Sequence, residues 1–136
     1  ADKIMDKLPP MLEAVKASGF DVVWCCDPMH GNTVKASSGY KTRRVNDVLG
    51  EVAGFFNAHD MVGTHPGGIH FEMTGSDVTE CVGGDVQSVS EEDLSNRYHT
   101  FCDPRLNANQ SLELAFLIAD LLQKRRGTKD GLAKAS

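Results

Sequence analysis

The sequence predicts an α/β fold with parallel strands, because segments with helical periodicity alternate with short apolar segments of strand length. The expected order is helix, strand, helix, strand, helix, strand, helix. Strands joined through a helix run parallel, since the crossover returns the chain to the same end of the sheet. A chain of 136 residues, of which 40% are hydrophobic, is large enough for one domain with its own core.

The first helix and the first strand are separated by a glycine. The helix is expected to have Pro10 in its first turn and to end at Gly19. Residues 21–26 then form a compact apolar run, which is typical of a strand buried on both faces. Residues 27–44 are polar and contain Gly and Ser, so we expect a loop there.

The second helix has recognisable signals at both ends. Asn46 is the expected N-cap, and Gly63 is the expected stop. One face between them is apolar at helical spacing and is expected to pack on the core. This stripe consists of Val48, Leu49, Val52, Phe55 and Phe56.

The second half of the chain begins with an expected strand at residues 68–73. A long Gly-rich segment, residues 74–89, follows it, and Ser90–Asp93 resembles a capping box at the start of a short helix. A third, short strand is expected at residues 100–102.

The last helix is expected at Asn109–Arg126, with Gly127 as its stop and a loose tail at 128–136. Its basic C-terminal residues would complement the helix dipole. We expect its buried face to consist of Leu112, Ala115, Phe116, Ala119 and Leu122.

Polar side chains that can bind metal occur at or just past the ends of the three expected strands. They are His30, Glu72 and Asp103. Parallel strands bring their carboxyl ends to one rim, and one imidazole with two carboxylates suits a divalent cation. The tripeptide Cys-Asp-Pro occurs twice, and an X-Pro step holds Asp27 and Asp103 in an extended conformation.

Each candidate also has a structural interpretation. On position, His30 is equally natural as a ligand or as a loop histidine, and the structural alternative for Asp103 is a cap of the turn before a proline. Asp27 occupies the equivalent turn and would orient the ring of His30 rather than bind a metal itself. Glu72 shares a strand face with His70, which we expect to be a hydrogen-bonded interior residue, and a buried carboxylate requires a cation nearby.

Other polar residues are ambiguous or favour a structural role. The basic residues Lys41, Arg43 and Arg44 either form solvated surface or hold a phosphate. His59 has Asn and Asp neighbours that suggest a position facing solvent.

Composition excludes several classes of protein. The net charge of −5, without a basic stripe, argues against nucleic-acid binding. The longest uncharged apolar stretch, Leu114–Ala119, is too short to span a membrane. The four cysteines lack C-x-x-C spacing, and three lie in apolar runs, so free thiols in a reducing compartment are expected. The chain starts at Ala1 without a signal peptide, which suggests a processed or cut polypeptide.

Several long motifs occur in an order that resembles a known family. They are WCCDPMHGNT, GYKTR, GTHPGGIHFEMTG, VTECVGG and RYHTFCDPRLNANQSLELAF. Together they resemble the C-terminal third of class II (plant-type) 3-deoxy-D-arabino-heptulosonate 7-phosphate (DAHP) synthase, from about Leu8 to Arg126. The resemblance implies the first step of the shikimate pathway, in which phosphoenolpyruvate condenses with erythrose 4-phosphate. It also implies a (β/α)₈ barrel, with residues 1–127 as strands six to eight of the catalytic domain and residues 128–136 as a flexible tail.

The resemblance assigns roles to the candidate residues. His30, Glu72 and Asp103 would be ligands of a divalent metal, most often Mn²⁺, with Co²⁺ or Zn²⁺ as alternatives. His30 would also relay a proton, and Lys41 would face the phosphate of erythrose 4-phosphate. The family's fourth ligand, a cysteine from an early strand, and most residues that bind phosphoenolpyruvate have no counterpart here.

The missing strands imply a partner for this chain. That partner is either the remainder of the same polypeptide or another copy in a homo-oligomer, in the cytoplasm or the plastid stroma. Two alternatives stay open: a non-catalytic fragment that packs within a larger assembly, and another metal-dependent barrel enzyme acting on phosphorylated aldehydes.

Overall fold

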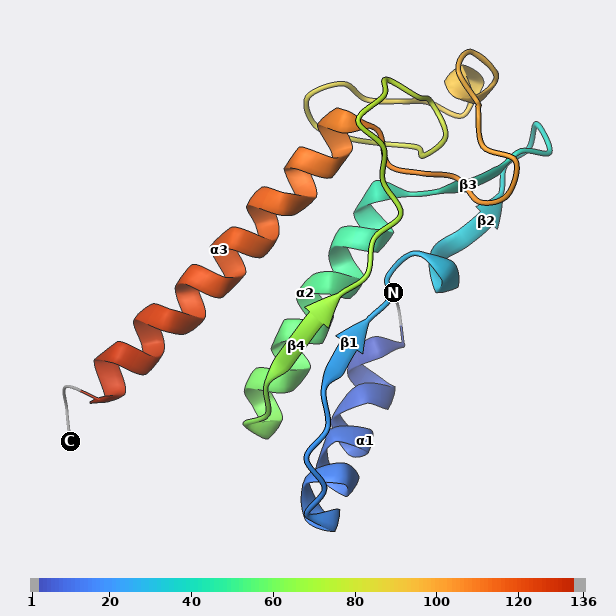
Figure 1. Ribbon diagram of the computed structural model, residues 1–136. Coiled ribbons are helices and arrows are strands. Elements are labelled where there is room, and N and C mark those ends of the chain that lie inside the picture. The colour runs from blue at the N-terminus through green and yellow to red at the C-terminus, as the bar shows by residue number, and fades with distance from the viewer. Residues whose placement is uncertain (1–2, 134–136) are drawn as a thin grey trace.

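The computed structural model describes residues 3–133, with side chains described for residues 3–127. In this part of the chain, long helices flank short strands (Figure 1). The elements are α1 (Ile4–Ser18), β1 (Trp24–Cys26), the 3₁₀ turn η1 (His30–Asn32), β2 (Thr33–Lys35), β3 (Lys41–Arg43), α2 (Val45–Val62), β4 (Pro66–Ile69), the 3₁₀ turn η2 (Glu92–Ser95) and α3 (Ala108–Ala133). No helix within this range is long and apolar enough to cross a lipid bilayer.

The parallel pair β1–β4 confirms the α/β prediction. Trp24 is paired with Pro66 and Cys26 with Ile69, and the two strands are connected through α2. The pairing extends one residue further, because the His70 N–H donates to the Cys26 carbonyl at 2.8 Å. In Figure 1, α1 and α2 lie together on one side of the two strands.

Past β4 the chain forms a second parallel contact, with Leu106. The Leu106 N–H donates to the Glu72 carbonyl at 3.1 Å, and the Thr74 N–H donates to the Leu106 carbonyl at 2.9 Å. Glu72 therefore lies between the part of the chain that pairs with β1 and the part that pairs with Leu106.

The prediction of a strand at residues 100–102 is wrong, because this segment forms a bend. Its neighbouring N–H groups, those of His99, Thr100 and Arg105, donate to the carboxylate of Glu80 rather than to a strand. Pro104 has no N–H to offer. The parallel contact with the chain past β4 consequently falls on Leu106, after the proline.

The ends of α1 and α2 that glycine predicted are confirmed, whereas the predicted starts of these two helices are not. Gly19 and Gly63 follow α1 and α2 in the left-handed conformation, with φ of 74° and 69°. However, α1 starts at Ile4 and contains both prolines in its second turn, where each removes one intrahelical hydrogen bond. Arg44, not Asn46, is the N-cap of α2, because its extended backbone continues directly from β3.

The expected loop at residues 27–44 contains regular structure. β2 and β3 form an antiparallel hairpin within it, with Thr33 opposite Arg43. Short polar strands such as these lack the apolar alternation that identifies a strand in a sequence.

The core is built on α2, whose apolar stripe is buried as predicted. Residues from β1, the loops and α3 complete it, and Leu49 packs at its edge. The fully or nearly buried members are Cys26, Met29, Val45, Val48, Val52, Phe55, Phe56, Cys81, Leu106 and Leu114.

The buried face of α3 differs from the prediction. Leu112 and Phe116 are 57% and 70% exposed, whereas Leu114 is buried against α2. Of the predicted face only Leu122 packs on the core, beside Leu117, Ile118 and Leu121. Apolar residues occur around most of this helix, so helical periodicity could not identify the face that meets the core.

The C-terminal end of α3 is also different. The helix continues through Gly127 to Ala133, and residues 134–136 of the expected tail lie outside the described range. Arg125 therefore does not complement a helix end. It pairs with Asp60 of α2 and lies over the Phe56 ring, 6.0 Å from its centroid, which ties α3 to α2.

The four cysteines are free thiols, in agreement with the prediction. Cys26 and Cys81 are buried, and burial raises the pKa of each to about 12. Cys25 and Cys102 are exposed, although both lie in apolar runs of the sequence.

His59 is buried, although its polar neighbours suggested solvent. Its ring packs edge-on against Phe55 and Trp24, and Nδ1 lies 2.7 Å from the Thr64 hydroxyl. Its Nε2 is buried without a hydrogen-bond partner among the described residues. The sequence does contain a signal for the burial of His59, because this residue follows Phe55 and Phe56 at helical spacing on the apolar stripe of α2.

We predict that His59 makes stability fall in mild acid. Burial, aided by the positive charge of Arg125, lowers the pKa of His59 below its ordinary value of 6.5. The unfolded chain therefore binds this proton more readily, so the free energy of unfolding decreases as the pH falls below 6.5. His59→Phe should flatten this dependence while changing stability at pH 8 by about 1 kcal/mol or less. Urea unfolding between pH 8 and pH 5 measures the effect.

The matched control is the exposed His99, whose replacement by Gln should preserve the wild-type pH dependence. An equally steep acid loss in His59→Phe would show that another group is responsible.

Candidate functional site

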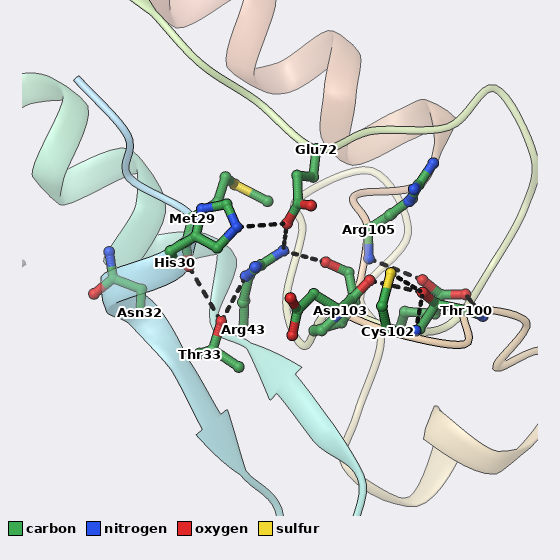
Figure 2. Close-up of polar contacts among 12 residues, drawn as sticks. Met29, His30, Asn32, Thr33, Arg43, Glu72, Thr100, Cys102, Asp103 and Arg105 are labelled. Atoms are coloured by element: carbon green, nitrogen blue, oxygen red, sulfur yellow. Dashed lines mark hydrogen bonds and ion pairs between the residues drawn. The ribbon is translucent and has the colours of Figure 1, made fainter. Parts of the chain in front are cut away.

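The candidate site lies where four segments meet beyond the ends of β1 and β4 (Figure 2). His30 stands in the 3₁₀ turn after β1, and Glu72 follows β4. Arg43 ends β3, and Asp103 lies in the bend that precedes Leu106. The parallel pairing brings the first two together, and the hairpin supplies the third.

His30 is oriented by Asp27, as predicted. Its Nδ1 lies 2.6 Å from Asp27 Oδ2, and Asp27 Oδ1 accepts the N–H groups of Met29 and His30 at 3.0 and 3.2 Å. Partial burial raises the pKa of Asp27, but these hydrogen bonds outweigh it and hold the pKa below its ordinary value. An ionised Asp27 accepts the Nδ1 proton, which leaves the Nε2 lone pair available as a ligand.

The Nε2 atom of His30 faces Glu72. It lies 3.9 Å from Glu72 Oε2 (Figure 2). That oxygen is buried and has no well-aligned hydrogen bond among the described residues, although Arg43 Nη1 lies 2.6 Å away. Two electron-pair donors that face one another in this way favour a cation or a proton between them.

Arg43 is the central residue of the site, and its side chain is 0% exposed. Its Nε donates to the Thr33 hydroxyl at 3.0 Å, and Nη1 donates to the Pro104 carbonyl and contacts Glu72. Nη2 is buried without a hydrogen-bond partner in the described part of the chain. The sequence did not distinguish Arg43 from Arg44, because adjacent arginines look alike until the hairpin turns one inward.

Asp103 is held by Lys41. The Lys41 Nζ donates to Asp103 Oδ1 at 3.2 Å. This hydrogen bond lowers the pKa of Asp103, and the charges of Lys41, Arg43 and His30 act in the same direction. Because Arg43 donates a hydrogen bond to the carbonyl of the next residue, Pro104, Asp103 lies beside Arg43 (Figure 2). Lys41 is exposed, so its ammonium group is open to a ligand from solvent.

His70 lies on the same face as Glu72, as the strand period predicts. Its ring stacks on that of His30, with 6.2 Å between centroids, while Ile69 and Phe71 pack against the core on the opposite face. The expectation that His70 is an interior residue is wrong for this chain, in which its side chain is exposed.

The residues fit a divalent cation chemically, although they do not form a closed cage. Within the described range no three His, Cys, Asp or Glu side chains are already gathered around one point. Glu72 Oε2, which has no hydrogen bond within the described range, and the oriented Nε2 of His30 nevertheless provide one oxygen and one nitrogen that face each other. Asp103 would supply a second oxygen, in place of its contact with Lys41.

Comparison with known proteins gives a consistent result. Residues 1–119 match the model of the class-II DAHP synthetase family. The chain is 58% identical over 122 residues to the phospho-2-dehydro-3-deoxyheptonate aldolase AroG of Mycolicibacterium smegmatis, which covers 90% of this chain and 26% of that protein. It is 63% identical over 121 residues to the phospho-2-dehydro-3-deoxyheptonate aldolase of Streptomyces coelicolor. This aligned region covers 89% of this chain and 27% of that protein.

The chain thus spans about a quarter of the length of these relatives. The family match extends over most of the chain and includes every candidate residue described above. The chain belongs to the class-II DAHP synthetase family.

Proposed function

We propose that the protein containing this chain is a DAHP synthase, which condenses phosphoenolpyruvate with erythrose 4-phosphate. The names of the relatives support this activity. The observation that carries it in this chain is the meeting of His30, Glu72 and Arg43 beyond the ends of two parallel strands. In α/β barrels, ligands bind at the rim formed by the carboxyl ends of the strands.

We further propose that β1 and β4 are two neighbouring strands of a (β/α)₈ barrel. Their parallel pairing through a crossover helix supports this architecture. Two strands leave open sheet edges, and apolar side chains beside β1, such as Phe20 and Val23, are exposed.

The remainder of the same polypeptide is the natural cover for these surfaces. A groove of about 220 Å³ lies between α2, β4 and α3, and it is lined mainly by apolar residues, among them Phe55, Ile69 and Leu122. The outward face of α3, at Leu112 and Phe116, is exposed as well. Parallel sheets are stable only when both faces are covered, so this chain alone is expected to be inactive.

A divalent cation would be held by His30, Glu72 and Asp103. We propose Mn²⁺, with Co²⁺ and Zn²⁺ as alternatives. When bound, the cation would act as a Lewis acid and polarise the aldehyde oxygen of erythrose 4-phosphate. Asp27 keeps the His30 ring fixed through Nδ1. Nε2 would serve as the ligand. The proton relay assigned to His30 by the resemblance is an alternative use of the same atom: when Nε2 carries a proton instead of binding the cation, it gives that proton to the developing alkoxide oxygen, and Asp27 stabilises the charged ring beforehand.

Two cations of this chain have separate roles in the proposal. Arg43 cannot be deprotonated, so it keeps a permanent positive charge against Glu72 and holds that carboxylate in place. Lys41 is exposed beside Asp103, and its ammonium group binds the phosphate of erythrose 4-phosphate.

The activity itself is the first test. The full-length protein with Mn²⁺ should release inorganic phosphate when both substrates are present. His30→Ala and Glu72→Gln should each lower kcat/KM by a factor of about 10² or more, because each removes a group at the reacting centre. His65→Ala, at an exposed site outside this cluster, serves as the control and should keep wild-type kinetics.

Absence of turnover in the full-length protein would reject the synthase proposal. Turnover of other phosphorylated aldehydes in preference to erythrose 4-phosphate would favour a different barrel enzyme.

Asp27→Asn tests the orientation of His30. An amide in place of the carboxylate no longer selects the tautomer with its proton on Nδ1, so Mn²⁺ affinity should fall by about 10- to 100-fold. Isothermal titration with Mn²⁺ measures this change. Asp120→Asn, on α3 away from the site, should bind Mn²⁺ as the wild type does. Unchanged affinity in Asp27→Asn would refute this role.

Arg43→Met tests the buried ion pair. Without the guanidinium group, Glu72 loses its counter-charge, and Thr33 and Pro104 lose their donor. Because Glu72 is partly open to solvent, we expect a loss of about 2 kcal/mol in the free energy of unfolding, below the range for fully buried pairs. The adjacent, exposed Arg44→Met should change it by about 0.5 kcal/mol or less, and equal effects of the two variants would refute the assignment.

A further inference from the structure

A second buried carboxylate, that of Glu80, lies behind the candidate site. Its residue is only 2% exposed. It belongs to the VTECVGG motif, for which the proposed reaction requires no role. A buried carboxylate has to be compensated by donors, so the identity of its donors indicates what it does.

All three donors to the Glu80 carboxylate are backbone N–H groups of one loop. Oε1 accepts from His99 at 2.9 Å and from Thr100 at 2.8 Å, and Oε2 accepts from Arg105 at 2.8 Å. These residues lie at the two ends of the segment 99–105. One carboxylate therefore pins both ends of the loop that contains Asp103.

Within this loop, side chains fix the remaining turn. The Thr100 hydroxyl donates to the Asp103 carbonyl at 2.8 Å and accepts the Cys102 N–H at 3.3 Å (Figure 2). The Pro104 carbonyl accepts a hydrogen bond from Arg43. With its ends and its middle held, the loop has little freedom to move Asp103.

Glu80 is itself attached to the strand that forms the site. Its carbonyl accepts the Thr42 hydroxyl at 2.9 Å, and two residues later the Val82 N–H donates to the Arg43 carbonyl at 2.8 Å. The segment that contains Glu80 thus runs beside β3, which also supplies Lys41 and Arg43. Through its backbone Glu80 is bound to β3, and through its carboxylate it is bound to the 99–105 loop, so it holds the loop at a fixed position relative to β3.

We propose that Glu80 is a positioning residue: its carboxylate fixes the 99–105 loop and so places Asp103 on the side of the molecule where His30 and Glu72 meet. The consequence for metal binding rests on the proposed function, whereas the consequence for the loop does not. Only a carboxylate suits this place, because it accepts on both oxygens. Glutamine would turn an NH₂ group toward at least one of the three N–H donors.

Glu80→Gln in the full-length protein tests this inference with two readouts. Hydrogen exchange of the His99, Thr100 and Arg105 amides should accelerate at least about tenfold, while the α2 amides keep wild-type protection. The Kd for Mn²⁺, measured by isothermal titration, should rise about 10- to 100-fold, as it does when a group that orients a ligand is removed.

Glu113→Gln is the matched control. The Glu113 carboxylate also accepts two backbone N–H groups, those of Asp85 and Val86 at 2.9 and 3.0 Å, but it holds a different loop. Both donors share Oε1, which glutamine keeps as a carbonyl oxygen, so this variant should keep near-wild-type exchange at those two amides and leave Mn²⁺ affinity unchanged.

A second variant covers the case in which Glu80→Gln does not fold. Thr100→Val keeps the shape of the side chain and removes the hydroxyl between Cys102 and Asp103. It should accelerate exchange at Cys102 and weaken Mn²⁺ binding in the same direction as Glu80→Gln, but by a smaller factor.

Three results would overturn the inference. The first is wild-type protection of the loop in Glu80→Gln, and the second is lost loop protection with unchanged Mn²⁺ affinity. The third is a loss of protection that extends through α2, which would make Glu80 a general core residue. If the wild type binds no Mn²⁺, the proposed function fails, and hydrogen exchange alone then decides whether Glu80 fixes the loop.

Discussion

The arrangement of the site depends on one buried cation, the guanidinium group of Arg43. Three segments that are distant in the sequence supply its acceptors: the hydroxyl of Thr33, the carboxylate of Glu72 and the carbonyl of Pro104. A buried guanidinium group cannot lose its proton, so its acceptors have to stay around it. The hairpin, the end of β4 and the loop before α3 are therefore held at fixed positions relative to one another.

Around this cation the site consists of oppositely charged partners. His30 is held by Asp27, Glu72 by Arg43 and Asp103 by Lys41. Each predicted ligand thus has its own partner from a neighbouring segment, which fixes its orientation before any ligand binds. Two buried atoms that remain without a hydrogen bond in the described part of the chain, Glu72 Oε2 and Arg43 Nη2, belong to this arrangement.

Several features of the fold and of the site could be predicted from local signals. Gly19 and Gly63 mark helix ends because few other residues adopt a positive φ. The stripe of α2 and the face shared by His70 and Glu72 follow from the helix and strand periods. Other features were not predictable locally. The face of α3 that meets the core was ambiguous because the helix is apolar around most of its circumference, and the third strand was misplaced because Glu80 takes the N–H groups that it needed.

The sequence by itself determined the family of this chain, the parallel α/β pattern, and the residue types that can bind a cation, because motifs, periodicity and ligand chemistry are local properties. Only the tertiary structure decided which charged residues are buried and which partner each of them has. Arg43 and Arg44 are neighbours in the sequence, yet one is the buried centre of the site and the other is exposed on the surface. The reason is physical: the burial and pairing of a charge depend on contacts between segments that are far apart along the chain.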